Sequence, residues 1–156
     1  MLYGNRYTYE FPVVIGLGMC ISMTIAAMGG NVGAQSATIV VRSIALGHVK
    51  EHHKQVKTIF REMRVGLMLG IVYGVVLGIV AHVLYGNRYT HEFPVVIGLG
   101  MCISMTIAAT MGAIEPMIFD HFGIDPATAT GPLITTITDI LTIFCYFTLA
   151  TILLLH

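Results

Sequence analysis

The stretch PLITTITDILTIFCYFTLATILLL, residues 132–155, decides the class of fold, because it is apolar throughout and carries a single charged side chain, Asp139. About 20 helical residues of this kind cross a hydrocarbon core of roughly 30 Å. Residues 65–84 and 93–118 are equally long and apolar, and residues 11–28 reach that length when 29–41 extend them. The sequence therefore predicts an all-α, polytopic membrane helical bundle. We expect four transmembrane helices, at about 11–41, 65–84, 93–118 and 130–155.

The composition agrees with this class. Hydrophobic residues make up 56% of the 156 residues and charged residues 10%, whereas soluble domains are about 45–50% apolar. The lipid bilayer is therefore the expected surrounding. The formal net charge is zero, so no nucleic-acid partner is indicated. No nucleophile, base and orienting residue occur at a recognisable spacing, and we expect no enzymatic activity.

The basic residues predict the orientation in the membrane. Six of the eight Lys and Arg residues lie between Arg42 and Arg64, and short basic loops stay on the cytoplasmic side. We therefore place the 43–64 loop in the cytoplasm and the protein in a cell membrane, most simply a bacterial inner membrane, as a multi-pass protein. Residues 47–63 mix charged and apolar side chains and are interpreted as an amphipathic cytoplasmic linker that leads into the second span.

A direct repeat occupies residues 2–27 and 84–109. The two copies are identical at 25 of 26 positions and differ only at Tyr9 and His91. Their continuations differ completely, so we interpret the repeat as a recent duplication, or an artefact of the gene record, rather than a functional symmetry.

Four glycines recur every fourth residue in the second span: Gly66, Gly70, Gly74 and Gly78. This spacing leaves one helix face without side chains and lets another helix approach closely. The pattern predicts the packing face of this span.

Asp139 is the residue that most directly indicates chemistry. An acid inside a span costs at least roughly 2.5–3.5 kcal/mol and needs a cation, a proton or a polar cavity. Gly131, Thr135 and Asp139 step by four residues and Thr142 extends the same helix face, which favours an ion path. In the alternative interpretation, the Thr hydroxyls bond back to the helix backbone and Asp139 is a neutral, hydrogen-bonded packing residue.

A second polar element is GGNVGAQSATIVVR, residues 29–42. Paired glycines can break a helix, and unwound backbone at membrane depth is tolerated where it lines a cavity. We therefore expect Gly30, Asn31 and Gln35 to line a pore with neutral oxygens, although packing through small residues is the alternative. Combined with Asp139, these oxygens predict a site for a hard cation.

Acids also lie near the inner end of the third span. Glu115 precedes Pro116, and Asp120 and Asp125 follow in a short loop. Acids at an inner pore mouth can concentrate cations. Solvation at the membrane interface, or helix capping, is the alternative for Glu115.

Three of these motifs carry a resemblance to a known family. GGNVGAQSATIVVRSIALG, the basic linker ending in REMRVGL, and GIDPATATGPLITTITDI occur here in order. Over roughly residues 28–156 they resemble the transmembrane domain of the MgtE family of magnesium channels and transporters. The resemblance implies a homodimer with five spans per subunit and a cation pore near the dimer axis. The family's first span and its cytosolic regulatory portions have no counterpart in this sequence.

The resemblance also implies roles for individual residues. Asp139 falls on the aspartate that faces the pore and binds magnesium in the family. Asn31 and Asp125 fall on motif residues of the cytoplasmic half of the pore, and Gly131 and Thr135 lie two turns and one turn below Asp139. We therefore expect a metal site formed by Asp139, Asn31, Thr135, Gly131 and Asp125, with Gly30, Gln35, Glu115 and Thr142 along the pore or at its mouth.

The functional hypothesis is a transmembrane channel or transporter for divalent cations, principally Mg²⁺, in which a largely hydrated ion passes Asp139 in a dimeric pore. A cation-coupled exporter of divalent metals is one alternative. A non-conducting fragment or interaction subunit is another. The sequence leaves the choice among magnesium, manganese, cobalt and nickel open.

Overall fold

The structure, a computed structural model, describes residues 4–49, 52–85, 92–129 and 131–155. Within these ranges the side chains of 4–15, 52, 85, 129, 154 and 155 are not described. The helices are α1 (Gly4–Ala45), α2 (His52–Tyr85), α3 (Glu92–His121), α4 (Pro126–Ala129) and α5 (Pro132–Leu155). No strand occurs in the described ranges.

The prediction of four membrane spans is confirmed by helix length and composition. The stretches long and apolar enough to cross a membrane are Gly16–Ala45, His53–Leu84, Glu92–His121 and Pro132–Leu153. Each belongs to a different long helix, whereas α4 is a single short turn between α3 and α5. The all-α membrane bundle therefore follows from the apolar runs, as expected.

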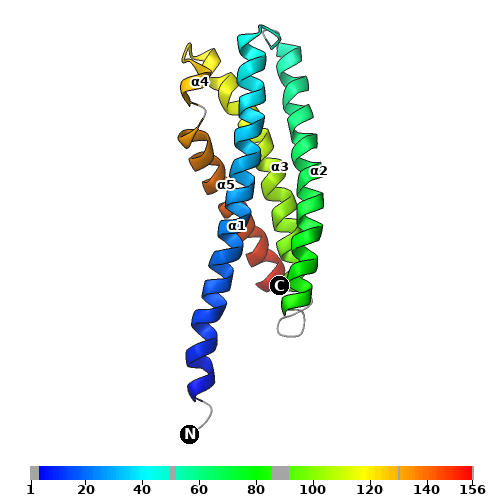
Figure 1. Ribbon diagram of the computed structural model, residues 1–156, viewed down its shortest axis with the longest axis vertical. Coiled ribbons are helices and arrows are strands. Elements are labelled where there is room, and N and C mark those ends of the chain that lie inside the picture. The colour runs from blue at the N-terminus through cyan, green and yellow to red at the C-terminus, as the bar shows by residue number, and fades with distance from the viewer. Residues whose placement is uncertain (1–3, 50–51, 86–91, 130, 156) are drawn as a thin grey trace.

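Helix α3 is the centre of the bundle and packs against α1, α2 and α5 (Figure 1). Along α1, Gly29 faces Ser104 of α3 and Gly33 faces Gly112, so these two helices run in the same direction. Thr142 of α5 lies at the level of Ser104 of α3, whose hydroxyl donates a hydrogen bond to its carbonyl oxygen. Tyr146, which is later in α5, lies against Gly100, which is earlier in α3. Helix α5 therefore runs opposite to α3, as successive spans must when they alternate direction across a membrane. The N-terminal part of α1 extends past the other helices in this view.

The glycine stripe of α2 packs against α3, as predicted. A Cβ atom at Gly70 would lie 2.7 Å from the backbone oxygen of Cys102, and one at Gly74 would lie 2.5 Å from that of Gly98. Any side chain at these positions would collide with backbone, so the absence of side chains is what allows the two helices to meet.

The expected helix break at Gly29 and Gly30 is wrong, because α1 is continuous from Gly4 to Ala45. These glycines instead admit neighbouring helices: Gly29 meets the methyl group of Thr142, and Gly33 meets the backbone of Ala108. The alternative of packing through small residues is therefore the one that the structure shows. Backbone carbonyls of an unbroken helix remain in its own hydrogen-bond ladder, so this segment offers side chains rather than freed carbonyls.

The basic segment between the first two spans divides into a turn and a helix. Residues 46–49 form the turn, and α2 then runs without interruption from His52 into its membrane span. The charged half of the 47–63 linker is thus the first part of the same helix that crosses the membrane.

Candidate cation site

Asp139 lies on α5 at its contact with α1. Its side chain is half-buried, and its Oδ1 atom is buried without a hydrogen-bond partner. A Cβ atom at Gly30 would lie 2.9 Å from this oxygen, so the carboxylate rests directly against the backbone of α1. A buried carboxylate oxygen without a donor is costly, and the hydrogen-bonded packing role considered for Asp139 does not fit it.

Asn31 and Gln35 lie on the open side of α1. Both are exposed, and with Ala34, Thr38 and Ile39 they line a cavity of about 650 Å³. Positions 31, 35 and 38 are one turn apart and therefore share one helix face. Gly30, in contrast, is buried against Asp139. The expectation that Gly30 lines the open face is therefore wrong for the single chain. It positions the carboxylate instead.

Gly131 and Thr135 form the start of α5. Gly131 has a φ of 147°, in the region that favours glycine. Its carbonyl oxygen accepts hydrogen bonds from both the N–H and the hydroxyl of Thr135, each at 3.1 Å. Thr135 is half-buried, and its hydroxyl bonds back to the helix backbone as the alternative interpretation anticipated. The Gly131 carbonyl is consequently engaged within the helix rather than free for an ion.

Thr142 does not line an open face. Its side chain is fully buried, its hydroxyl donates to the carbonyl of Asp139 at 3.1 Å, and its methyl group packs on Gly29. The expectation of a pore-lining Thr142 is therefore wrong for the single chain. The residue belongs to the contact between α1 and α5, because its position faces the glycines rather than the open side.

The sequence reading missed Thr138. This side chain is fully buried against Gly33, and its hydroxyl oxygen is without a hydrogen-bond partner. Two neighbouring residues of α5, Thr138 and Asp139, thus each place an unpartnered oxygen against a glycine of α1. The four-residue spacing of Gly29 and Gly33 is the signal that could have located this contact.

Asp125 lies outside the membrane spans, between α3 and α4. It is exposed, and its carboxylate oxygen accepts the N–H of Ala127 at 2.9 Å. This is the geometry of a residue that caps the start of a helix. Its observed role in the single chain is to hold the short α4 turn.

Glu115 is buried in α3, with 5% of its side chain exposed and both carboxylate oxygens without partners. The expectation of a residue at an open mouth is wrong for the single chain, and so are solvation at the interface and capping. A mouth residue would face solvent, and this one faces the neighbouring helices.

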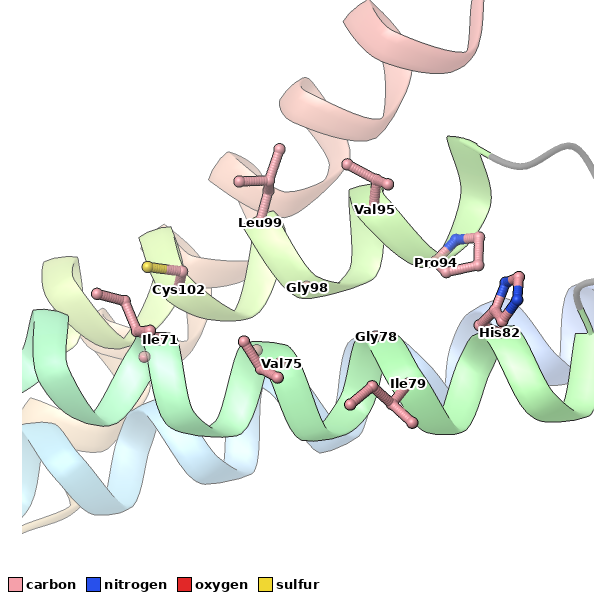
Figure 2. Close-up of a pocket in the computed structure, with 12 residues that line it drawn as sticks. Ile71, Val75, Gly78, Ile79, His82, Pro94, Val95, Gly98, Leu99 and Cys102 are labelled. Carbon is pink, nitrogen blue, oxygen red and sulfur yellow. The ribbon is translucent and has the colours of Figure 1, made fainter.

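A second cavity, of about 580 Å³, lies between α2 and α3 (Figure 2). Three glycines of α2 and Gly98 of α3 form its floor, and Ile71, Val75 and Leu99 stand along its sides; the three are Gly70, Gly74 and Gly78. No carboxylate occurs among the described residues that line it. It is an apolar groove on the outside of the bundle and offers no ligands for a hard cation.

Among the described side chains, the contact between α1 and α5 carries a single carboxylate, that of Asp139. Within the described ranges no group of three or more His, Cys, Asp or Glu side chains could hold a metal ion. A single carboxylate suits an ion that keeps much of its water, as Mg²⁺ usually does.

Four apolar spans, one of which carries an acid with a buried, unpartnered oxygen, define a multi-pass membrane protein. Comparison with known proteins identifies the family. Residues 10–149 match the MgtE family, described as divalent cation transporters. The chain belongs to this family, and the resemblance found in its motifs is confirmed.

Named relatives agree. The magnesium transporter MgtE of Enterococcus faecalis is 35% identical over 136 residues, which cover 86% of this chain and 28% of that protein. The corresponding transporter of Bacillus subtilis is 34% identical, with 88% and 30% covered. That of Thermus thermophilus is 30% identical, with 81% and 27% covered. The chain spans less than a third of the length of these relatives.

Proposed function

We propose that this chain conducts Mg²⁺ across a membrane through a pore that two copies form around Asp139. The observation that carries the proposal is the Asp139 carboxylate, which lies against Gly30 of α1 with Oδ1 buried and unpartnered. An ionised carboxylate at membrane depth needs a compensating cation. Relatives named as magnesium transporters support the choice of ion.

The open face of α1 supports a pore between two copies. Asn31, Gln35 and Thr38 are exposed on a helix that is apolar along most of its span. Polar side chains at membrane depth face a bundle interior or a water-filled cavity rather than lipid. A second copy facing this side would enclose the polar stripe and place two Asp139 carboxylates around one ion path.

Conduction in hydrated form follows from the sparse ligand set. Mg²⁺ sheds water reluctantly and is held by one or two carboxylates with several waters. Two carboxylates would hold a divalent ion against monovalent competitors, with Asn31 and Thr135 contacting its waters. The interaction through water also keeps binding weak enough for release.

The membrane potential supplies the driving force. With the basic 42–64 segment on the cytoplasmic side, the ion would move inward toward the C-terminal end of α1. An inside-negative potential contributes about 2.3 kcal/mol per charge per 100 mV, and twice that for a divalent ion.

The test is Mg²⁺ uptake by liposomes that contain the chain, compared with D139N and with D120N as a matched control. Asp120 is exposed in the last turn of α3, so its substitution removes the same charge at the end of a span, away from the contact between Asp139 and Gly30. We expect uptake by the unsubstituted chain and D120N and its loss in D139N, with the Bacillus subtilis transporter as positive control. Equal uptake by D139N, or no uptake by the unsubstituted chain, would refute the proposal.

A further inference from the structure

Two buried glutamates lie near the basic end of the bundle and differ in their surroundings. Glu62 of α2 is 2% exposed, accepts a hydrogen bond from Ser36 at 3.0 Å and lies 3.5 Å from Nε of Arg61. Glu115 of α3 is 5% exposed, and neither of its oxygens has a partner. The fold thus supplies a donor and a cation to one acid and leaves the other with neither.

Both acids lie at nearly the same depth. Gly66, one turn after Glu62, contacts Ala109, and because α2 and α3 are antiparallel, Glu62 lies near the level of Ala113. Burial depth therefore does not explain the difference between the two carboxylates. What differs is the helix face that each one occupies.

Glu115 shares the face of α3 that meets α1 and α5. Ser104 lies eleven residues earlier, close to three full turns, and it contacts Thr142 of α5 and Gly29 of α1. Ala108 lies on the same side and contacts Gly29 and Gly33, between which Gly30 lies along α1. Asp139, which contacts Gly30, therefore lies near the level of Ala108. Glu115 follows Ala108 by seven residues, so it lies about 10 Å inward of Asp139 by the rise of the helix.

The backbone beside Glu115 adds a further oxygen. Pro116 has no N–H, so the carbonyl of Gly112 lacks its usual donor four residues later. This carbonyl and the two oxygens of Glu115 belong to consecutive turns of α3. A carboxylate, a carbonyl and water are the ligands that a hard divalent cation takes.

We infer that Glu115 is a second binding position for a divalent cation, inward of Asp139 and separate from it. The inference rests on the proposed function, because the ion would come from the Asp139 site. Two positions about 10 Å apart provide the multi-site occupancy that allows a bound ion to leave when the next one enters.

The test counts bound Mn²⁺, used as a spectroscopic substitute for Mg²⁺, by electron paramagnetic resonance on the chain in lipid nanodiscs. We expect E115Q to bind one Mn²⁺ per chain fewer than the unsubstituted protein. The matched control is E62Q, an equally buried acid, which should bind the unsubstituted number. The same loss should occur when E115Q is added to D139N, so a failure of the Asp139 site would remain distinguishable from a failure of the inner one.

Equal Mn²⁺ binding by E115Q and the unsubstituted chain would overturn the inference, since Glu115 would then be neutralised by a proton alone. An equal loss in E62Q would also overturn it, because the effect would be general loosening. If E115Q does not fold, the NMR spectrum of D139N labelled with ¹³C-methyl methionine gives a second measurement of Mn²⁺ binding. Mn²⁺ should broaden the signal of Met117, two residues from Glu115, and leave the exposed Met68 sharp. A sharp Met117 signal would refute the inner position.

Discussion

Gly30 sets the position of the Asp139 carboxylate, so Gly30→Ala should weaken Mg²⁺ binding without unfolding the protein. The new Cβ atom would lie 2.9 Å from Oδ1, and ordinary contacts begin near 3.4 Å, so the carboxylate must retreat by about 0.5 Å. Binding geometry must hold to about this tolerance. We expect the Mg²⁺ concentration for half-maximal uptake to rise roughly tenfold, equivalent to about 1.4 kcal/mol. Liposome uptake over a range of Mg²⁺ concentrations measures it.

The stability of G30A should change little, because the clash involves the end of a movable side chain and Ala is favoured over Gly in a helix by about 1 kcal/mol. Gly112→Ala is the contrasting variant. There the new Cβ would meet the backbone oxygen of Gly33, which cannot move aside, and we expect a loss of about 1–3 kcal/mol in the free energy of unfolding. Thermal unfolding followed by circular dichroism compares the two. Unchanged Mg²⁺ dependence in G30A, or destabilisation equal to that of G112A, would refute the reasoning.

Three further outcomes follow from the contacts. D125N should retain Mg²⁺ uptake, because Asn caps a helix as well as Asp does, whereas D125A should lose stability, because Ala provides no cap. Loss of uptake in D125N with its fold intact would instead mean that Asp125 binds the ion. S36A should lower the free energy of unfolding by about 1.5–3 kcal/mol, since it leaves the buried Glu62 oxygen without its donor, and an unchanged unfolding midpoint would contradict this. G74A should destabilise the chain by about 1–3 kcal/mol through collision with the Gly98 backbone, whereas V75A, on the exposed side of α2, should not, as unfolding in detergent would show.

The fold could be predicted because the membrane restricts the choice. A backbone in hydrocarbon must satisfy its own hydrogen bonds, so an apolar run of sufficient length becomes a helix. The glycine stripe of α2 also specified its contact, since four missing side chains on one face have few other uses. Both inferences depend on patterns within a single helix.

The site was harder to predict because its details depend on neighbouring helices. Paired glycines permit either a helix break or a close helix contact, and the sequence of α1 alone does not distinguish them. The contact occurs because Asp139 and Thr138 of α5 fill the space that Gly30 and Gly33 leave. In the same way, the hydroxyl of Thr142 suggested a pore face. The rotation of α5 instead buries this side chain with its methyl group against Gly29 of α1, and the hydroxyl bonds back to its own helix.

The repeated segment shows how strongly position determines the use of a sequence. In residues 98–109 of α3, Met101 and Met105 are almost fully buried, and Gly100 admits the ring of Tyr146.

The matching residues of α1 do none of this. Met19 and Met23 are 59% and 67% exposed, and Gly16 and Gly18 have no neighbouring atom within 4 Å of an added Cβ. Glycine in a helix weakens it unless a close approach requires its small size. The contacts of the α3 copy therefore account for the shared sequence, whereas among the described side chains of the α1 copy the buried ones are Ser22, Ile25 and Ala26. This asymmetry favours duplication of a segment whose residues suit the centre of the bundle. In α1 the contacts explain the sequence from the end of the repeat onward, where Ile25 is buried and Gly29 meets α3 and α5.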